Sequence, residues 1–250
     1  MTRFKIALAQ INVQLDKNAN LEKANEMALE ASKNGAGLVV FPECFNTPYD
    51  TKYFRDYAEV IDTSNPSGTT LMLSNIAKEC GVFIVGGSIP EKDPWSGKYF
   101  NTSVVFDNHG IIIAVHRKMH LADLNAPGRV VLSESDVFSP GSDITVFATP
   151  WGNIGLGICY DIRFTEISLI SARRDNVIMM IFPAAFTAPN GQMFWEIYVA
   201  GCGPAQDETV PFHSNAHSTV VGPDGLVVVD GGVEEKVVYC DIGMVPLNLH

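Results

Sequence analysis

The chain of 250 residues has few basic side chains for its acidic ones. Lys and Arg number 17 against 28 Asp and Glu, which gives a net charge of −11. A protein that binds the phosphate backbone of a nucleic acid needs a basic surface. The basic residues here form no run longer than a pair such as Arg173-Arg174. The composition therefore argues against nucleic acid as a partner.

Cysteines are few, and their pattern offers no disulfide framework. There are five, an odd number, widely spread and without a Cys-x-x-Cys pair. This pattern favours reduced thiols in a reducing compartment. We expect a cytoplasmic protein, with a mitochondrial location left open.

Long apolar segments are lacking as well. Residues 1–10 have no apolar core after Arg3 and Lys5, so they predict a first strand rather than a signal peptide. The longest strongly apolar run, 177–186, is too short to span a bilayer and contains Pro183. We expect a soluble intracellular chain without a membrane partner.

Helical and strand patterns alternate in the first part of the sequence. Apolar spacing predicts helices over 20–33 and 69–80, the first stopped by Asn34-Gly35 and the second by Gly81. Compact apolar runs predict strands at 4–11, 37–41 and 82–89.

After residue 99 the pattern changes to antiparallel pairs. Residues 100–106 and 111–115 flank a short polar turn, and 121–140 is typical of a loop. One more helix is predicted at 165–173, and further strands at 146–148, 154–158, 177–182, 218–221, 226–229 and 237–242. A mixed α/β sheet with helices outside it is the natural packing. With no linker, repeat or low-complexity segment, we predict one domain over 1–250.

Three predicted strand ends carry groups that can do chemistry. Glu43 ends the strand that runs through Phe-Pro-Glu, Lys118 ends the strand after His116, and Cys159 ends a glycine-spaced strand. Each also has a purely structural interpretation: Glu43 as a turn residue, Lys118 as a solvated lysine and Cys159 as a core cysteine. Together they offer a nucleophile, a base and a cation, which is what attack on an amide carbon requires.

Other constellations are weak. His116 and His120 are four apart, as are His213 and His217, but neither pair forms His-Glu-x-x-His, so the sequence argues against zinc. No Gly-x-Ser-x-Gly elbow, phosphate-binding loop or complete dinucleotide glycine pattern is present. We expect no metal and no cofactor.

The contexts of the three residues resemble the nitrilase superfamily of carbon–nitrogen hydrolases. They are Phe-Pro-Glu at 41–43, Arg-Lys-Met-His-Leu at 117–121 and Gly-Ile-Cys-Tyr-Asp at 157–161. The resemblance covers 5–242 and implies a four-layer α-β-β-α sandwich with a Glu-Lys-Cys triad at strand ends. Segments 43–49, 52–54, 86–91, 134–135 and 139–141 are similar to the omega-amidase branch.

That branch hydrolyses the side-chain amide of α-ketoglutaramate and α-ketosuccinamate to the ketoacid and ammonia. The resemblance implies that Cys159 forms a thioester, that Glu43 is the base and that Lys118 and the Tyr160 amide hold the oxyanion. It also implies a second glutamate, Glu134, that supports Lys118; on the sequence alone this would be a solvated loop carboxylate.

Other residues, Tyr160 among them, are candidates for substrate binding. Arg163 lies near the nucleophile and could hold the distal carboxylate of the substrate. A structural role, in which it ties its helix to Glu166 or to a neighbouring subunit, is slightly favoured. Phe45, Tyr49 and Phe186 are candidates for pocket walls or for plain core.

The chain departs from the family at two places. Relatives carry a full helix where we predict only a shortened one near 197–201, and they continue beyond residue 250 into a tail that packs on a partner subunit. A homodimer is expected by resemblance. The alternatives are another carbon–nitrogen hydrolase, acting on deaminated glutathione, an N-carbamoyl amino acid or a nitrile, or a weakly active form that serves as an interaction module.

Overall fold

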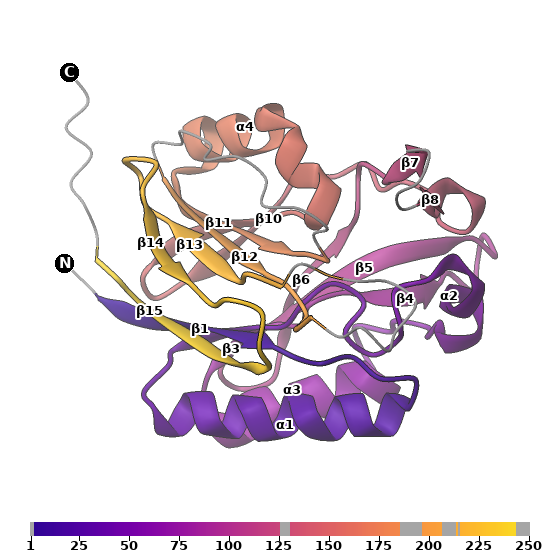
Figure 1. Cartoon of the computed structure of the whole chain (residues 1–250), viewed down its shortest axis with the longest axis horizontal. Helices are drawn as coiled ribbons and strands as arrows, with labels where there is room; N and C mark the ends of the chain where they lie inside the picture. Colours follow the sequence, from indigo (N-terminus) through magenta and orange to yellow (C-terminus); the bar gives the residue numbers. More distant parts are fainter. Residues whose placement is uncertain (1–2, 126–130, 186–196, 207–213, 215, 244–250) are drawn as a thin grey trace.

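The computed structural model describes residues 3–125, 131–185, 197–206, 214 and 216–243. They form four layers in the order helix, sheet, sheet, helix (Figure 1). Helices α1 (Lys17–Lys33) and α3 (Gly68–Cys80) cover the first sheet, and α4 (Thr165–Asp175) covers the second. The four-layer α/β architecture predicted from the sequence is confirmed.

The first sheet has seven strands in the order β15-β1-β2-β3-β5-β4, with β6 also paired to β5. Strands β1, β2 and β3 are parallel, and the remaining pairs are antiparallel. The strands are β1 (Phe4–Gln10), β2 (Leu38–Val40), β3 (Phe83–Val85), β4 (Ile89–Lys92), β5 (Tyr99–Phe106), β6 (Ile112–Arg117) and β15 (Lys236–Ile242).

The second sheet has six strands in the order β14-β13-β12-β11-β10-β9, with β10, β11 and β12 parallel. Its strands are β9 (Thr145–Thr149), β10 (Gly152–Leu156), β11 (Val177–Pro183), β12 (Tyr198–Cys202), β13 (Thr219–Val221) and β14 (Val227–Asp230). Smaller elements complete the chain: helix α2 (Thr51–Tyr57), the paired strands β7 (Asp123–Asn125) and β8 (Val131–Ser133), and the 3₁₀ turns η1 (Glu134–Asp136) and η2 (Cys159–Arg163).

The core lies between the layers. Along β1, Ala7 and Ala9 pack toward α1 and α3, whereas Ile6 and Leu8 pack between the two sheets. Side chains alternate across a strand, so β1 is apolar at nearly every position because both of its faces are covered. A further cluster lies under α4, where Ile167 packs with residues of the second sheet.

Helix boundaries follow caps that the apolar pattern does not show. Helix α1 begins at Lys17, ahead of the predicted start at residue 20, because the Asp16 side chain accepts a hydrogen bond from the Asn18 N–H at 2.8 Å. Gly81 ends α3 in the left-handed region with a φ of 65°, as the sequence predicted. Among the described residues, no helix is long and apolar enough to cross a membrane.

The prediction of a shortened helix near 197–201 is wrong, because Tyr198–Cys202 is strand β12. The side chains alternate there: Ala200 and Cys202 face the space between the sheets, and Val199 faces the core under α4. This period of two belongs to a strand covered on both faces. Residues 186–196 lie outside the described residues.

The carboxyl ends of the parallel strands of both sheets meet. The Glu43 N–H, just after β2, reaches the carbonyl of Ala184, just after β11, at 3.4 Å. The Cys202 thiol at the end of β12 lies 3.2 Å from the carbonyl oxygen of Val40. Residues that follow these strands are therefore brought to one place.

Candidate active site

Cys159 follows β10 on a sharp turn. Its φ is 45°, in the left-handed region that side chains rarely adopt, and it opens η2. Such a conformation costs about 1–3 kcal/mol and persists only where neighbouring contacts hold it. Here Asp161 supplies those contacts: its N–H donates to the Ile158 carbonyl at 3.0 Å and its Oδ2 accepts from the Ile158 N–H at 2.9 Å. Cys159 is buried at this turn.

Lys118 lies between two carboxylates. Its Nζ is 2.8 Å from Glu43 Oε1 and 2.8 Å from Glu134 Oε2, and all three side chains are fully buried. A buried ammonium is costly unless it is paired and hydrogen-bonded, and these two glutamates provide the partners. The structure thus brings Glu43, Lys118 and Glu134 into one cluster, and Glu134 is not a solvated loop carboxylate.

Further donors fix the two glutamates. The Tyr49 hydroxyl donates to Glu134 Oε1 at 2.5 Å, and the Ala122 N–H donates to Glu134 Oε2 at 2.6 Å. Asn101 on β5 donates to Glu43 Oε1 at 2.9 Å. Glu43 Oε1 is therefore occupied by Lys118 and Asn101, whereas Oε2 is buried without a conventional hydrogen bond from the described residues.

The electrostatics set the protonation states at neutral pH. Burial raises the pKa of Glu43; Lys118 opposes that shift and Glu134 adds to it. Burial and the charge of Glu43 raise the pKa of the Cys159 thiol well above its ordinary value. Burial alone would lower the pKa of Lys118, but the two glutamates outweigh it and raise that pKa well above the ordinary value. The cluster thus holds a neutral thiol beside a charged lysine.

Glu43 and Cys159 lie close enough to shift each other's pKa. Their side-chain contact lowers the pKa of Glu43 and raises that of Cys159, the directions expected when a thiol donates to a carboxylate. A carboxylate whose pKa is raised toward neutrality is a better proton acceptor for such a thiol than an exposed glutamate.

Asp161 joins the turn at Cys159 to the segment after β6. Besides holding Ile158, its Oδ1 accepts from the His120 N–H at 2.8 Å and lies 2.8 Å from His120 Nδ1. Burial alone would raise the pKa of Asp161, but its bonds to His116, Ile158 and His120 lower it overall. Neither Asp161 nor Asn101 was assigned a role from the sequence. The sequence does hold one signal for Asp161. It is a carboxylate at the third position of a turn that follows a strand, and a carboxylate there can cap the turn.

The predicted substrate-binding residues that the structure describes separate into three groups. Tyr49 lies in the glutamate cluster. Phe45 is fully buried and stacks on Phe41 in the core below the first sheet, which is the core alternative. Tyr160 is half-buried, and the exposed Arg163 guanidinium lies 5.3 Å from its ring; Arg163 forms no ion pair with a described residue. Phe186 lies outside the described residues.

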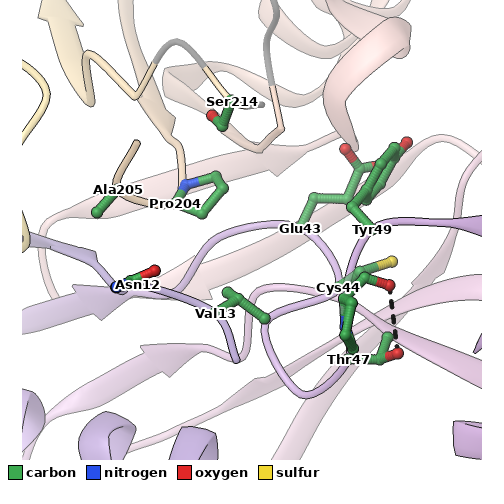
Figure 2. Close-up of a pocket in the computed structure, with 10 residues that line it drawn as sticks. Asn12, Val13, Glu43, Cys44, Thr47, Tyr49, Pro204, Ala205 and Ser214 are labelled. Carbon is green, nitrogen blue, oxygen red and sulfur yellow. Dashed lines mark hydrogen bonds between the residues drawn. The ribbon is translucent and has the colours of Figure 1, made fainter. Parts of the chain in front are cut away.

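A small cavity opens beside Glu43 (Figure 2). Its volume is about 20 Å³, and Figure 2 shows Asn12 and Val13 at one side and Glu43 and Tyr49 at the other. The lining comes from the segments after β1, β2 and β12, together with Ser214. In the described residues no group of His, Cys, Asp and Glu is arranged to hold a metal ion.

Comparisons with known proteins agree with this arrangement. The carbon–nitrogen hydrolase family model matches residues 5–245. The chain is 45% identical to an omega-amidase of Bos taurus over 255 residues, covering 98% of this chain and 90% of that protein. The corresponding figures for the Homo sapiens omega-amidase are 42% identity and the same coverage. The bovine alignment is longer than this chain, so that relative has residues with no counterpart here.

Solved structures give the same result. The Saccharomyces cerevisiae protein Nit3, described as a member of branch 10 of the nitrilase superfamily, superposes with a TM-score of 0.86 at 39% identity. That match covers 96% of this chain and 89% of Nit3. An amidase from Nesterenkonia sp. has the same fold, with a TM-score of 0.80 at 24% identity over 96% of this chain and 90% of that one. The chain belongs to the carbon–nitrogen hydrolase family, within the nitrilase superfamily.

Proposed function

We propose that this carbon–nitrogen hydrolase is an omega-amidase in which Cys159 is the nucleophile, Glu43 the general base and Lys118 the oxyanion-stabilising cation. The observation that carries the proposal is the buried Glu43–Lys118–Glu134 cluster in contact with a thiol. Burial strengthens each electrostatic interaction in such a cluster. The omega-amidases at 42–45% identity support the substrate class.

Acylation begins with the neutral thiol. Glu43 takes the proton of Cys159 while Sγ attacks the carboxamide carbon of the substrate. Negative charge develops on the amide oxygen, and the Lys118 ammonium and the Tyr160 N–H stabilise it. The C–N bond then breaks, and ammonia leaves with the proton that Glu43 returns. A thioester on Cys159 remains, and Glu43 is again ionised.

Deacylation uses the same base. Water loses a proton to Glu43 as its oxygen attacks the thioester carbon, and the C–S bond breaks. The Cys159 sulfur recovers that proton, and the free acid is released. Glu134 acts on Lys118 in both steps: it holds the ammonium in place and keeps it charged, since its carboxylate raises the pKa of Lys118.

The substrates that fit this proposal are small dicarboxylic acid monoamides, α-ketoglutaramate and α-ketosuccinamate. The test is ammonia release from these two compounds beside an N-carbamoyl amino acid, a nitrile and deaminated glutathione. We expect the two monoamides to give the highest kcat/KM. A preference for the carbamoyl compound, or no turnover by a folded sample, would reject the omega-amidase proposal. The Cys159→Ala variant is the control for ammonia that arises without the thiol.

A further inference from the structure

We propose that Ser88 is a positioning residue for the general base, because it holds the backbone on both sides of Glu43. The inference deepens the proposed function and rests on the role of Glu43 in it. Ser88 lies in the segment 86–88, between β3 and β4, and is fully buried. It acts through Glu43 rather than on the substrate.

The parallel pairing of β2 and β3 brings Ser88 to the base. Val40 at the end of β2 lies beside Val85 at the end of β3. The chain continues from Val40 toward Glu43 and from Val85 toward Ser88. Residues that follow neighbouring parallel strands emerge at the same edge of a sheet. Ser88 is therefore placed beside the turn that carries Glu43.

Two hydrogen bonds of Ser88 flank the base. The Ser88 N–H donates to the Pro42 carbonyl at 3.2 Å, and the Cys44 N–H donates to the Ser88 hydroxyl oxygen at 3.0 Å. Only Glu43 lies between these two partners, and its own N–H reaches the Ala184 carbonyl at 3.4 Å. One residue thus holds the peptide groups before and after the base. Of its two bonds, only the one from Cys44 depends on the Ser88 side chain.

The turn at Cys44 needs this support. The φ of Cys44 is 50°, in the left-handed region that is unfavourable for a residue with a Cβ. Cys44 is also buried, so its N–H would be a costly unsatisfied donor without the Ser88 hydroxyl. If the hydroxyl is removed, both costs are relieved when Cys44 leaves the left-handed region. Glu43, the preceding residue, then moves as well.

The segment that carries Ser88 is fixed and fits closely against the turn. The Gly86 N–H donates to the carbonyl of Val104 on β5 at 2.9 Å. Gly87 has a φ of 57°, and a Cβ added there would lie 2.2 Å from the Pro42 carbonyl oxygen. Only glycine therefore allows the segment to come this close. Ser88 holds the turn from a rigid support, which is what positioning requires.

Loss of this hold should affect the rate more than substrate binding. The Glu43 carboxylate is fixed by Lys118 and Asn101, and Ser88 supplies the fixed point at the backbone. A displacement of about 1 Å can cost on the order of a hundredfold in rate. Glu43 accepts a proton in acylation and again in deacylation, so both steps should slow together. We therefore expect kcat to fall while KM changes little.

The test removes the hydroxyl and measures kcat and KM separately. Ser88→Ala keeps the N–H that bonds to Pro42 and loses only the acceptor for Cys44. With α-ketoglutaramate, we expect kcat to fall on the order of tenfold to a hundredfold and KM to stay within about threefold. Ser103→Ala is the matched control, because Ser103 on β5 is equally buried and its hydroxyl has no hydrogen-bond partner among the described residues. It should change neither kcat nor KM.

A conservative variant and the folded state separate positioning from a structural role. Ser88→Thr keeps the hydroxyl and should retain kcat within about threefold. If folded Ser88→Thr loses as much kcat as Ser88→Ala, the hydroxyl is not the positioning group. If Ser88→Ala lowers only the free energy of unfolding in urea, or raises KM at an unchanged kcat, the inference is wrong.

A further variant applies if Ser88→Ala does not fold. Ser88→Cys keeps a weaker acceptor, and under reducing conditions kcat should fall about threefold to tenfold. An unchanged kcat in that variant would contradict the inference. The unmodified chain tests the omega-amidase proposal separately: absence of turnover there rejects that proposal, whereas the Ser88 variants are compared with an unmodified chain that turns over.

Discussion

At the scale of single residues, the site depends on one lysine between two glutamates. Each charge in the cluster holds the others in place: Lys118 opposes the shift that burial imposes on Glu43, and the glutamates keep Lys118 charged. The same arrangement keeps the thiol protonated until a substrate is present. Catalysis at such a site therefore depends on proton transfer to Glu43 rather than on a preformed thiolate.

The ionisation of Glu43 should set the acid limb of kcat/KM. Glu43 must be ionised to act as a base, and its pKa is raised, so activity is lost as pH falls through that raised value. We expect this limb at higher pH than for an exposed glutamate. Asn101→Leu removes a donor to the carboxylate and should move the limb to still higher pH. Asn65→Leu, at an exposed position, should leave it in place. A limb that does not respond to Asn101 would argue against Glu43 as the base.

Removing the central cation should destabilise the fold. Lys118→Met leaves Glu43 and Glu134 buried without their shared partner, and breaking a buried ion pair in this way costs about 3–5 kcal/mol. Urea unfolding measures this loss in the free energy of unfolding at neutral pH. Lys98→Met at an exposed site should change it by less than about 0.5 kcal/mol. Equal stabilities for the two variants would contradict the described cluster.

At the scale of elements, Asp161 connects two of the strand ends that form the site. It holds the turn after β10 to the segment after β6, so it fixes Cys159 relative to Lys118. The turn η2 determines where Asp161 lies. This turn is too short to show an apolar period in the sequence. We regard Asp161 as a positioning residue.

In Asp161→Asn an N–H₂ group would face one of the backbone N–H donors. We expect the free energy of unfolding to fall by about 2–3 kcal/mol, and kcat to fall at least tenfold while KM changes little. Asp175→Asn, which affects only a contact with Arg174 at the protein surface, is the control. An unchanged kcat in a folded Asp161→Asn variant would limit this residue to a structural role.

The sequence predicted the elements that have strong periodicity and missed those that depend on local contacts. Helix α3 and strands β1, β5 and β15 follow from apolar spacing and from Gly81. Helix α2 has seven residues of which only Phe54 is buried, so it offers no pattern to detect. Glu43, Lys118 and Cys159 could be found because each closely follows a strand. Asn101 could not, because its contact with Glu43 arises only where separate strands meet.

At the scale of the whole molecule, we predict a homodimer. The apolar side chains Leu169 and Ile170 on α4 are 45% and 41% exposed, and self-association through this helix would bury apolar area. Light scattering should give twice the chain mass of 27.2 kDa. Leu169→Glu should shift the mass toward the monomer. Leu226→Glu, at an exposed apolar residue that precedes β14, should not. A monomeric unmodified chain would contradict the prediction.

The proposed function requires that Cys159 carries a thioester whose formation and hydrolysis depend on the buried glutamate–lysine cluster. The most direct measurement is intact-protein and peptide mass spectrometry on samples quenched in acid during turnover of α-ketoglutaramate. We predict a mass increase equal to the substrate minus ammonia, located on the peptide that contains Cys159 and absent from Cys159→Ala. An adduct that persists in Cys159→Ala, or turnover in that variant, would contradict the claim.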